Sequence, residues 1–109
     1  MTTITKTNTK AGMTVRISGH AGAARKNGYD LCCAAVSMLA YTLMKILSDS
    51  RPKNLVITRA EADVFVSFDF FCLRAFPAFA AVKTVMAGYK LLEEKYPENV
   101  RIVSGVTKA

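Results

Sequence analysis

The residues of this sequence that could do chemistry together are one histidine and two adjacent cysteines, separated by a short segment of small and basic residues. His20 lies at the end of a strand pattern, and Cys32 and Cys33 lie at the start of an apolar helix pattern. A thiol is mostly protonated at neutral pH, so it attacks well only where its thiolate is stabilised, as at a helix N-terminus. A nearby histidine can take the thiol proton and later protonate a leaving amine. The pattern indicates either a catalytic pair or, alternatively, a structural histidine beside core cysteines.

The element that must position the thiols is a helix predicted over residues 31–48, with Asp30 as its N-cap. Both cysteines then lie in its first turn, where backbone N–H groups are not yet paired. Neighbouring side chains on a helix point about 100° apart, so only one thiol should face the segment that carries the histidine. Gly28 permits a tight entry into the helix and lets backbone amides approach a substrate, where they could form an oxyanion hole.

Two motifs carry a resemblance to a known family. The sequence resembles the ribosomal-processing cysteine proteases called Prp at Gly19-His20-Ala21 and at Gly28-x-Asp30-Leu31-x-Cys33-Ala34-Ala35-Val36-Ser37. The resemblance implies a cytoplasmic bacterial endopeptidase, usually a homodimer, that needs no cofactor or metal. It further implies a substrate, the large-subunit ribosomal protein numbered twenty-seven. The family removes its short N-terminal extension by cutting just after a pair of aromatic residues.

The family's catalytic pair carries over onto His20 and Cys33, because the three-residue step from Asp30 selects Cys33 and not Cys32. The sequence departs from the family pattern at Cys32, where a branched aliphatic residue is common. It also departs in the variable loop 21–27, which is a residue longer than in some members. A redox protein that uses the two adjacent thiols is disfavoured, because the chain has no CxxC spacing.

Two further polar residues of the motif have open roles. Ser37 lies four residues after Cys33 on the same helix face, where it could orient the thiol or bind substrate. It could equally be a buried hydroxyl bonded to the preceding turn. Asp30 is expected to be a cap, although a side chain that reached His20 would fix the tautomer of the imidazole.

The remaining patterns predict one α+β domain over residues 1–109. Its order is about ββαββα(β), which is typical of a two-layer α/β sandwich with a mostly antiparallel sheet and two main helices. The expected strands are residues 4–8, 13–18, 55–57, 64–70 and a short 101–103, with a hairpin turn near 60–62, and the helices are residues 31–48 and 77–96.

Composition restricts the classes of partner. The net charge is +7, from 15 basic and 8 acidic residues, and residues 1–29 contain five basic residues and no acid. A non-catalytic, basic, ribosome-associated or RNA-binding dimer is therefore the alternative function. Nucleic-acid binding is disfavoured because the chain has no KH or RRM motif. Three cysteines without metal-type spacing favour a reducing compartment and argue against a disulfide scaffold or a metal site.

The first helix pattern is apolar on nearly all sides. As a membrane span it would be at the short limit, and Ser37, Thr42 and Lys45 interrupt it, so a buried helix is favoured and no membrane partner is expected. One sheet cannot bury every side, which predicts a homodimer packed on this helix. The apolar positions include Met38, Leu39, Tyr41, Leu43, Met44, Ile46 and Leu47.

The phenylalanines all fall between residues 65 and 79. Most are expected in the core, with one or two left to line a pocket for aromatic substrate side chains. Cys72 is expected to be a core thiol.

Overall fold

A computed structural model describes residues 1–19, 31–69 and 75–106 of the chain. The elements are β1 (Thr2–Asn8), β2 (Gly12–Ser18), α1 (Leu31–Ser50), β3 (Val56–Ala60), β4 (Asp63–Asp69), α2 (Ala75–Lys95) and β5 (Val100–Val106). This is the predicted order, including the final strand, and the α+β class is confirmed.

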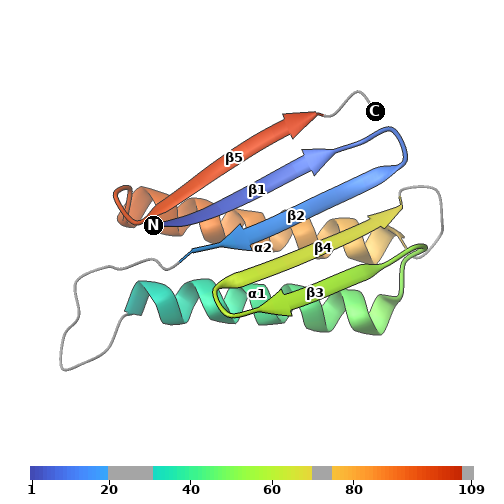
Figure 1. The fold of residues 1–109 in the computed structure, drawn as a ribbon, viewed down its shortest axis with the longest axis horizontal. Coiled ribbons are helices and arrows are strands. Elements are labelled where there is room, and N and C mark those ends of the chain that lie inside the picture. The colour runs from blue at the N-terminus through green and yellow to red at the C-terminus, as the bar shows by residue number, and fades with distance from the viewer. Residues whose placement is uncertain (20–30, 70–74, 107–109) are drawn as a thin grey trace.

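The strands form one five-stranded sheet in the order β3-β4-β2-β1-β5. Neighbouring strands are antiparallel except for β1 and β5, which run parallel from Thr2 opposite Val100 to Asn8 opposite Val106. Figure 1 shows the sheet as one layer, with α1 and α2 together forming the layer behind it. The predicted mostly antiparallel, two-layer architecture is therefore correct, with one parallel strand at an edge.

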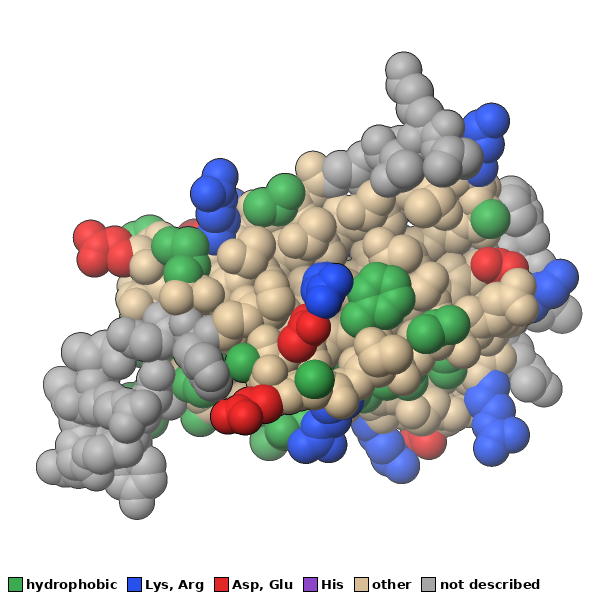
Figure 2. Space-filling model, viewed as in Figure 1, with side chains coloured by type: hydrophobic (Ala, Val, Ile, Leu, Met, Phe, Trp, Pro, Cys, Tyr) green, Lys and Arg blue, Asp and Glu red, His purple; other side chains and the backbone are tan. Residues whose placement is uncertain are grey.

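The two faces of the sheet differ because side chains alternate along each strand. The inner face of β2 carries Met13, Val15 and Ile17, all buried, and that of β4 carries the buried Val64, Val66 and Phe68. The outer face carries partly exposed or exposed polar residues, such as Thr14 and Arg16. Figure 2 views this outer face, where charged side chains of both signs stand among a few hydrophobic ones.

The helices pack on the inner face and on each other. A Cβ atom at Gly88 of α2 would lie 2.9 Å from the Cδ2 of Leu39 on α1, so the glycine permits a close approach of the two helices. The buried Tyr89 hydroxyl donates a hydrogen bond to the carbonyl of Val36, 3.0 Å away. Burial raises the pKa of Tyr89, so this phenol stays protonated and bonded. These contacts fix α1 relative to α2.

Several element boundaries differ from the sequence prediction. α1 continues two residues beyond Ser48, and α2 begins at Ala75, so that Pro77 is its third residue rather than its first. β5 spans seven residues instead of three. The hairpin turn near 60–62 is formed without glycine, because Ala62 itself adopts a φ of 55°. The predicted strand end at Phe70 lies outside the described residues, as does Cys72, which was predicted to be a core thiol.

The apolar side chains around α1 are only partly buried by the sheet and by α2 of the same chain. Cys32, Val36, Ala40, Leu43 and Leu47 face the core. Leu39, Met44 and Ile46 are partly buried against that core. Leu31, Met38 and Tyr41 remain exposed.

By length and composition alone, α1 is long and apolar enough to cross a membrane. The same test is passed by the core helices of soluble proteins and by signal sequences; 28% of the apolar window of α1 is buried in the structure.

Candidate active site

The two adjacent cysteines have different surroundings in α1. The helix begins at Leu31, so both lie in its first turn, where backbone N–H groups have no carbonyl partner within the helix and the positive end of the helix dipole favours an anion. Cys32 is fully buried in the core. Cys33, rotated away from it on the helix, is only half-buried and lines a pocket. The accessible sulfur at this helix terminus is therefore that of Cys33.

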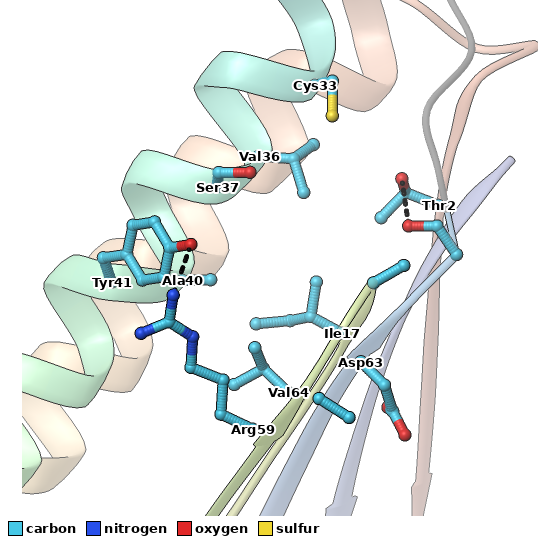
Figure 3. Close-up of a pocket in the computed structure, with 13 residues that line it drawn as sticks. Thr2, Ile17, Cys33, Val36, Ser37, Ala40, Tyr41, Arg59, Asp63 and Val64 are labelled. Atoms are coloured by element: carbon cyan, nitrogen blue, oxygen red, sulfur yellow. Dashed lines mark hydrogen bonds between the residues drawn. The ribbon is translucent and has the colours of Figure 1, made fainter.

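The pocket lies between the N-terminal half of α1 and one end of the sheet, and its volume is about 130 Å³. Figure 3 shows Cys33 at one end of it and Tyr41 and Arg59 at the other. The residues that line it are Thr2, Ile17, Gly19, Cys33, Val36, Ser37, Ala40, Tyr41, Arg59, Ala60, Ala62, Asp63 and Val64. The pocket is thus mainly apolar, with the thiol and a guanidinium at opposite ends.

The end of β2 is held at this pocket by two hydrogen bonds. The N–H of Gly19 donates to the carbonyl of Ala62, 2.8 Å away, and the carbonyl of Gly19 accepts from the Thr2 hydroxyl at 3.3 Å. Gly19 and Leu31 are the described residues on either side of segment 20–30, and Leu31 lies two residues before Cys33. Gly19, the residue before His20 in the sequence, and Cys33 both line the pocket.

Three of the five predicted site residues fall within that segment. His20, Gly28 and Asp30 lie outside the described residues, so their proposed roles remain predictions. The other two, Cys33 and Ser37, are brought together on one face of α1 and line the same pocket.

The Ser37 hydroxyl differs from two other hydroxyls of its helix. Thr42 and Ser50 donate to the carbonyls of Met38 and Ile46 in the preceding turn, at 2.7 and 2.6 Å. Ser37 makes no such bond within the described part of the chain. Figure 3 shows its oxygen on the side of the helix that faces the pocket, where a substrate group could reach it.

The carboxylate at the pocket rim is turned away from the thiol and is already neutralised. Asp63 accepts two hydrogen bonds from the guanidinium of Arg16, at 3.0 and 2.7 Å. This contact holds the pKa of Asp63 below its ordinary value. Figure 3 shows the carboxylate pointing away from Cys33. Asp63 is therefore poorly placed to act on the thiol.

The aromatic residues play a mainly structural part. Phe68 is buried and meets the ring of Phe79 edge-to-face, with ring centroids 5.9 Å apart. None of the described phenylalanines lines the pocket, and Phe70 and Phe71 lie outside the described residues. The aromatic residue that does line it is Tyr41, which the sequence singled out only as an apolar position of its helix.

A thiol at a helix N-terminus, open to a pocket in a two-layer α+β fold, defines this chain as a candidate cysteine-dependent hydrolase. A model of the family "Cysteine protease Prp" matches residues 1–101. The chain therefore belongs to the Prp family of cysteine proteases. A comparison with curated proteins finds no significant match.

Solved structures share this fold. The ribosomal processing protease Prp from S. aureus, in complex with a covalently linked product peptide, superposes with a TM-score of 0.78 at 19% identity, covering 95% of this chain and 99% of that one. The same protease with a substrate peptide gives a TM-score of 0.73 at 17% identity, with the same coverage. SMU.848 from Streptococcus mutans gives 0.69 at 23% identity, covering 98% of this chain and 96% of that one.

Proposed function

We propose that this chain is a cytoplasmic endopeptidase that removes the short N-terminal extension of the large-subunit ribosomal protein numbered twenty-seven, in support of ribosome assembly. The observation that carries the proposal is the half-buried Cys33 thiol, which opens from the first turn of α1 into a pocket also lined by Gly19, the residue before His20 in the sequence. Membership of a cysteine protease family supports the reaction class. The peptides bound to the S. aureus protease of the same fold support a peptide substrate.

In the proposed mechanism, His20 accepts the proton of the Cys33 thiol, and the sulfur attacks the carbonyl carbon of the scissile peptide bond. Backbone amides between Gly28 and Cys33 donate to the oxyanion of the tetrahedral intermediate. As the C–N bond breaks, the imidazolium protonates the leaving amine, and an acyl-enzyme thioester remains. His20 then deprotonates a water that hydrolyses the thioester and restores the thiol. No metal or cofactor takes part.

Two other motif residues complete the proposed site. The Ser37 hydroxyl, which faces the pocket one helical turn beyond Cys33, binds a polar group of the substrate backbone. Asp30 precedes the first residue of α1 and caps the helix whose N-terminus stabilises the thiolate. We further propose that the protein acts as a homodimer, because apolar side chains on the outer side of α1 are left uncovered.

The decisive experiment is cleavage of a peptide that spans the extension and its junction, with single substitutions that separate the three candidate groups. Cys33→Ala and His20→Ala should each abolish cleavage, because a nucleophile and its base cannot replace one another. Cys32→Ala should retain most of the activity, since that side chain lies in the core. Circular dichroism of each variant shows whether it is folded.

Each contrary outcome has a separate meaning. Full activity in Cys33→Ala would refute the mechanism, and loss in Cys32→Ala alone would move the nucleophile by one residue. The rival function, a basic RNA-binding dimer, predicts RNA affinity that falls steeply with salt. Peptide cleavage should persist at salt concentrations that remove such binding.

A further inference from the structure

The pocket extends well beyond the thiol, along one face of α1. Cys33, Ser37 and Tyr41 follow at four-residue intervals, and all three line it. At 1.5 Å per residue, the eight positions from Cys33 to Tyr41 span about 12 Å along the helix axis. An extended peptide advances about 3.3 Å per residue, so a substrate that followed this face would place its third or fourth residue from the scissile bond at Tyr41.

The far wall of the pocket is a cation held on an aromatic ring. The guanidinium of Arg59 lies 4.6 Å from the centroid of the Tyr41 ring, and its Nη2 donates to the Tyr41 hydroxyl at 3.0 Å. The two side chains come from different elements, the edge strand β3 and the helix α1. Their contact therefore links the sheet to the helix across the end of the pocket (Figure 3). Two simultaneous interactions fix the orientation of the planar guanidinium.

The same pair also borders a second hollow. Tyr41, Arg59, Ala60 and Ala62 line both the pocket of Cys33 and this hollow, which Glu61 lines as well. The pair thus stands at the end of the pocket opposite the thiol (Figure 3).

The charge of this wall is not balanced within the described residues. Arg59 takes part in none of their ion pairs. The carboxylate that shares the pocket, Asp63, is engaged by Arg16 and points away. Arg59 is exposed, so water screens part of its charge, but much of the remaining lining is apolar and screens the charge less than water does. A second cation brought to this end of the pocket would therefore be repelled.

We propose that Arg59, clamped on Tyr41, is a specificity-determining wall that admits uncharged substrate side chains and rejects lysine or arginine about three to four residues from the scissile bond. This inference rests on the proposed peptidase function of the same pocket. Two unit charges about 4 Å apart near a protein surface repel strongly enough to weaken recognition by about tenfold when solvent screens part of the charge.

The test uses the full chain and a set of peptides around the cleaved bond. Each peptide carries Lys at one of the four positions on either side, and its partner carries the nearly isosteric, uncharged Met there. The measured quantity is kcat/KM for the Met peptide divided by kcat/KM for the Lys peptide at each position. A general loss of activity in a variant lowers both values equally and leaves this ratio unchanged. Wild type should prefer Met by about tenfold at one position in the expected distance range.

Substitutions then show whether Arg59 causes the preference for Met over Lys. Arg59→Met should bring the ratio at that position close to one, Arg59→Lys should keep most of it, and Tyr41→Phe should reduce it by freeing the guanidinium. Arg101→Met is the matched control, because Arg101 is an exposed arginine on β5, at the opposite edge of the sheet. It should show the wild-type ratios. Equal ratios in wild type and Arg59→Met would overturn the inference.

The experiment distinguishes failure of the proposed peptidase function from failure of the inference about Arg59. If wild type cleaves none of the uncharged peptides, the peptidase proposal fails. In that case, fluorescence anisotropy measures the dissociation constants of the same Met and Lys peptides. The ratio of the two constants, compared between wild type and Arg59→Met, then tests the role of Arg59. Binding without an Arg59-dependent preference would also overturn the inference.

Discussion

Gly19 occupies the point at which the chain leaves β2 for the segment that begins with His20. Its φ is +91°, a conformation that residues with a side chain rarely adopt. A Cβ atom there would lie 2.3 Å from the carbonyl oxygen of Met1, which is backbone and cannot turn aside. Both conditions require glycine, so the residue before the histidine is fixed by geometry as well as by its two hydrogen bonds.

We therefore expect Gly19→Ala to lower the free energy of unfolding by about 2 kcal/mol or more, through strain and displacement of β1 or β2. It should also lower kcat/KM of the folded protein, because His20 follows directly. Urea unfolding and peptide cleavage measure the two effects.

Gly12→Ala is the matched control, since its Cβ would meet the carbonyl oxygen of Phe68 at 2.0 Å, at the other end of β2. It should lose stability while the folded fraction keeps its activity. Unchanged stability and activity in Gly19→Ala would contradict the assigned role.

For single residues, the sequence predicted those features of the site that depend on spacing along one helix. Helix periodicity predicts that Cys32 and Cys33 face different sides and places Ser37 on the side of Cys33, while the family motif selects Cys33 as the nucleophile. It could not reveal the pairing of Tyr41 with Arg59, because these residues are eighteen positions apart and meet only when β3 docks beside α1. Arg59 in a strand pattern resembles any exposed strand residue until the tertiary contact is known.

Among the elements, β5 was the least well predicted, and the reason is physical. It pairs in parallel with β1, so no hairpin turn joins it to its partner strand in the sequence. As an edge strand it buries Val100 but leaves Val103 exposed, which weakens the apolar alternation. Hairpin strands such as β1 and β2 were found because turn residues and alternation occur together.

The attachment of β5 to α2 gives a pH-dependent prediction. The Glu93 carboxylate accepts a hydrogen bond from the Ile102 N–H at 2.8 Å and another from Lys90 at 3.1 Å, and both lower its pKa from the ordinary value of 4.5. A carboxylate with a lowered pKa stabilises the fold above its unfolded-state pKa, and this contribution is lost as the pH falls through the folded-state pKa. We expect Glu93→Gln to lose less stability on acidification than wild type.

Urea unfolding at about pH 6.5 and at about pH 3.5, on either side of the carboxylate pKa range, measures this difference. Glu94→Gln, a neighbouring change at an exposed position of α2, should keep the wild-type pH dependence. If Glu93→Gln and wild type lost stability equally, the hydrogen bond to β5 would carry no pH-dependent stabilisation.

For the whole molecule, the uncovered side of α1 is the feature that one chain does not explain. Met38 and Leu31 are 65% and 63% exposed and lie seven positions apart, on the same side of the helix. Packing against α2 covers other apolar positions of α1, which reduces but does not remove the reason for predicting a dimer.

We expect wild type to sediment as a dimer and Met38→Asp to weaken that dimer by at least about tenfold, because a charge would be buried at its centre. Analytical ultracentrifugation across a concentration series measures this. Leu91→Asp is the control, since Leu91 is 66% exposed but lies on α2. A wild type that stays monomeric, or equal effects of both variants, would exclude α1 as the interface.

The hydrogen bonds around Thr2 have a consequence for the order in which the molecule folds. Its hydroxyl holds Gly19 at the pocket, while its backbone N–H donates to the carbonyl of Asn99, 2.8 Å away. One residue thus joins parts of the chain separated by almost its full length, and contacts of such long sequence separation form slowly because large loops must close first. The anchoring of Thr2 through its own backbone therefore requires the segment that leads into β5. A chain that still lacks that segment holds Gly19 through a Thr2 that is not yet fixed from this side.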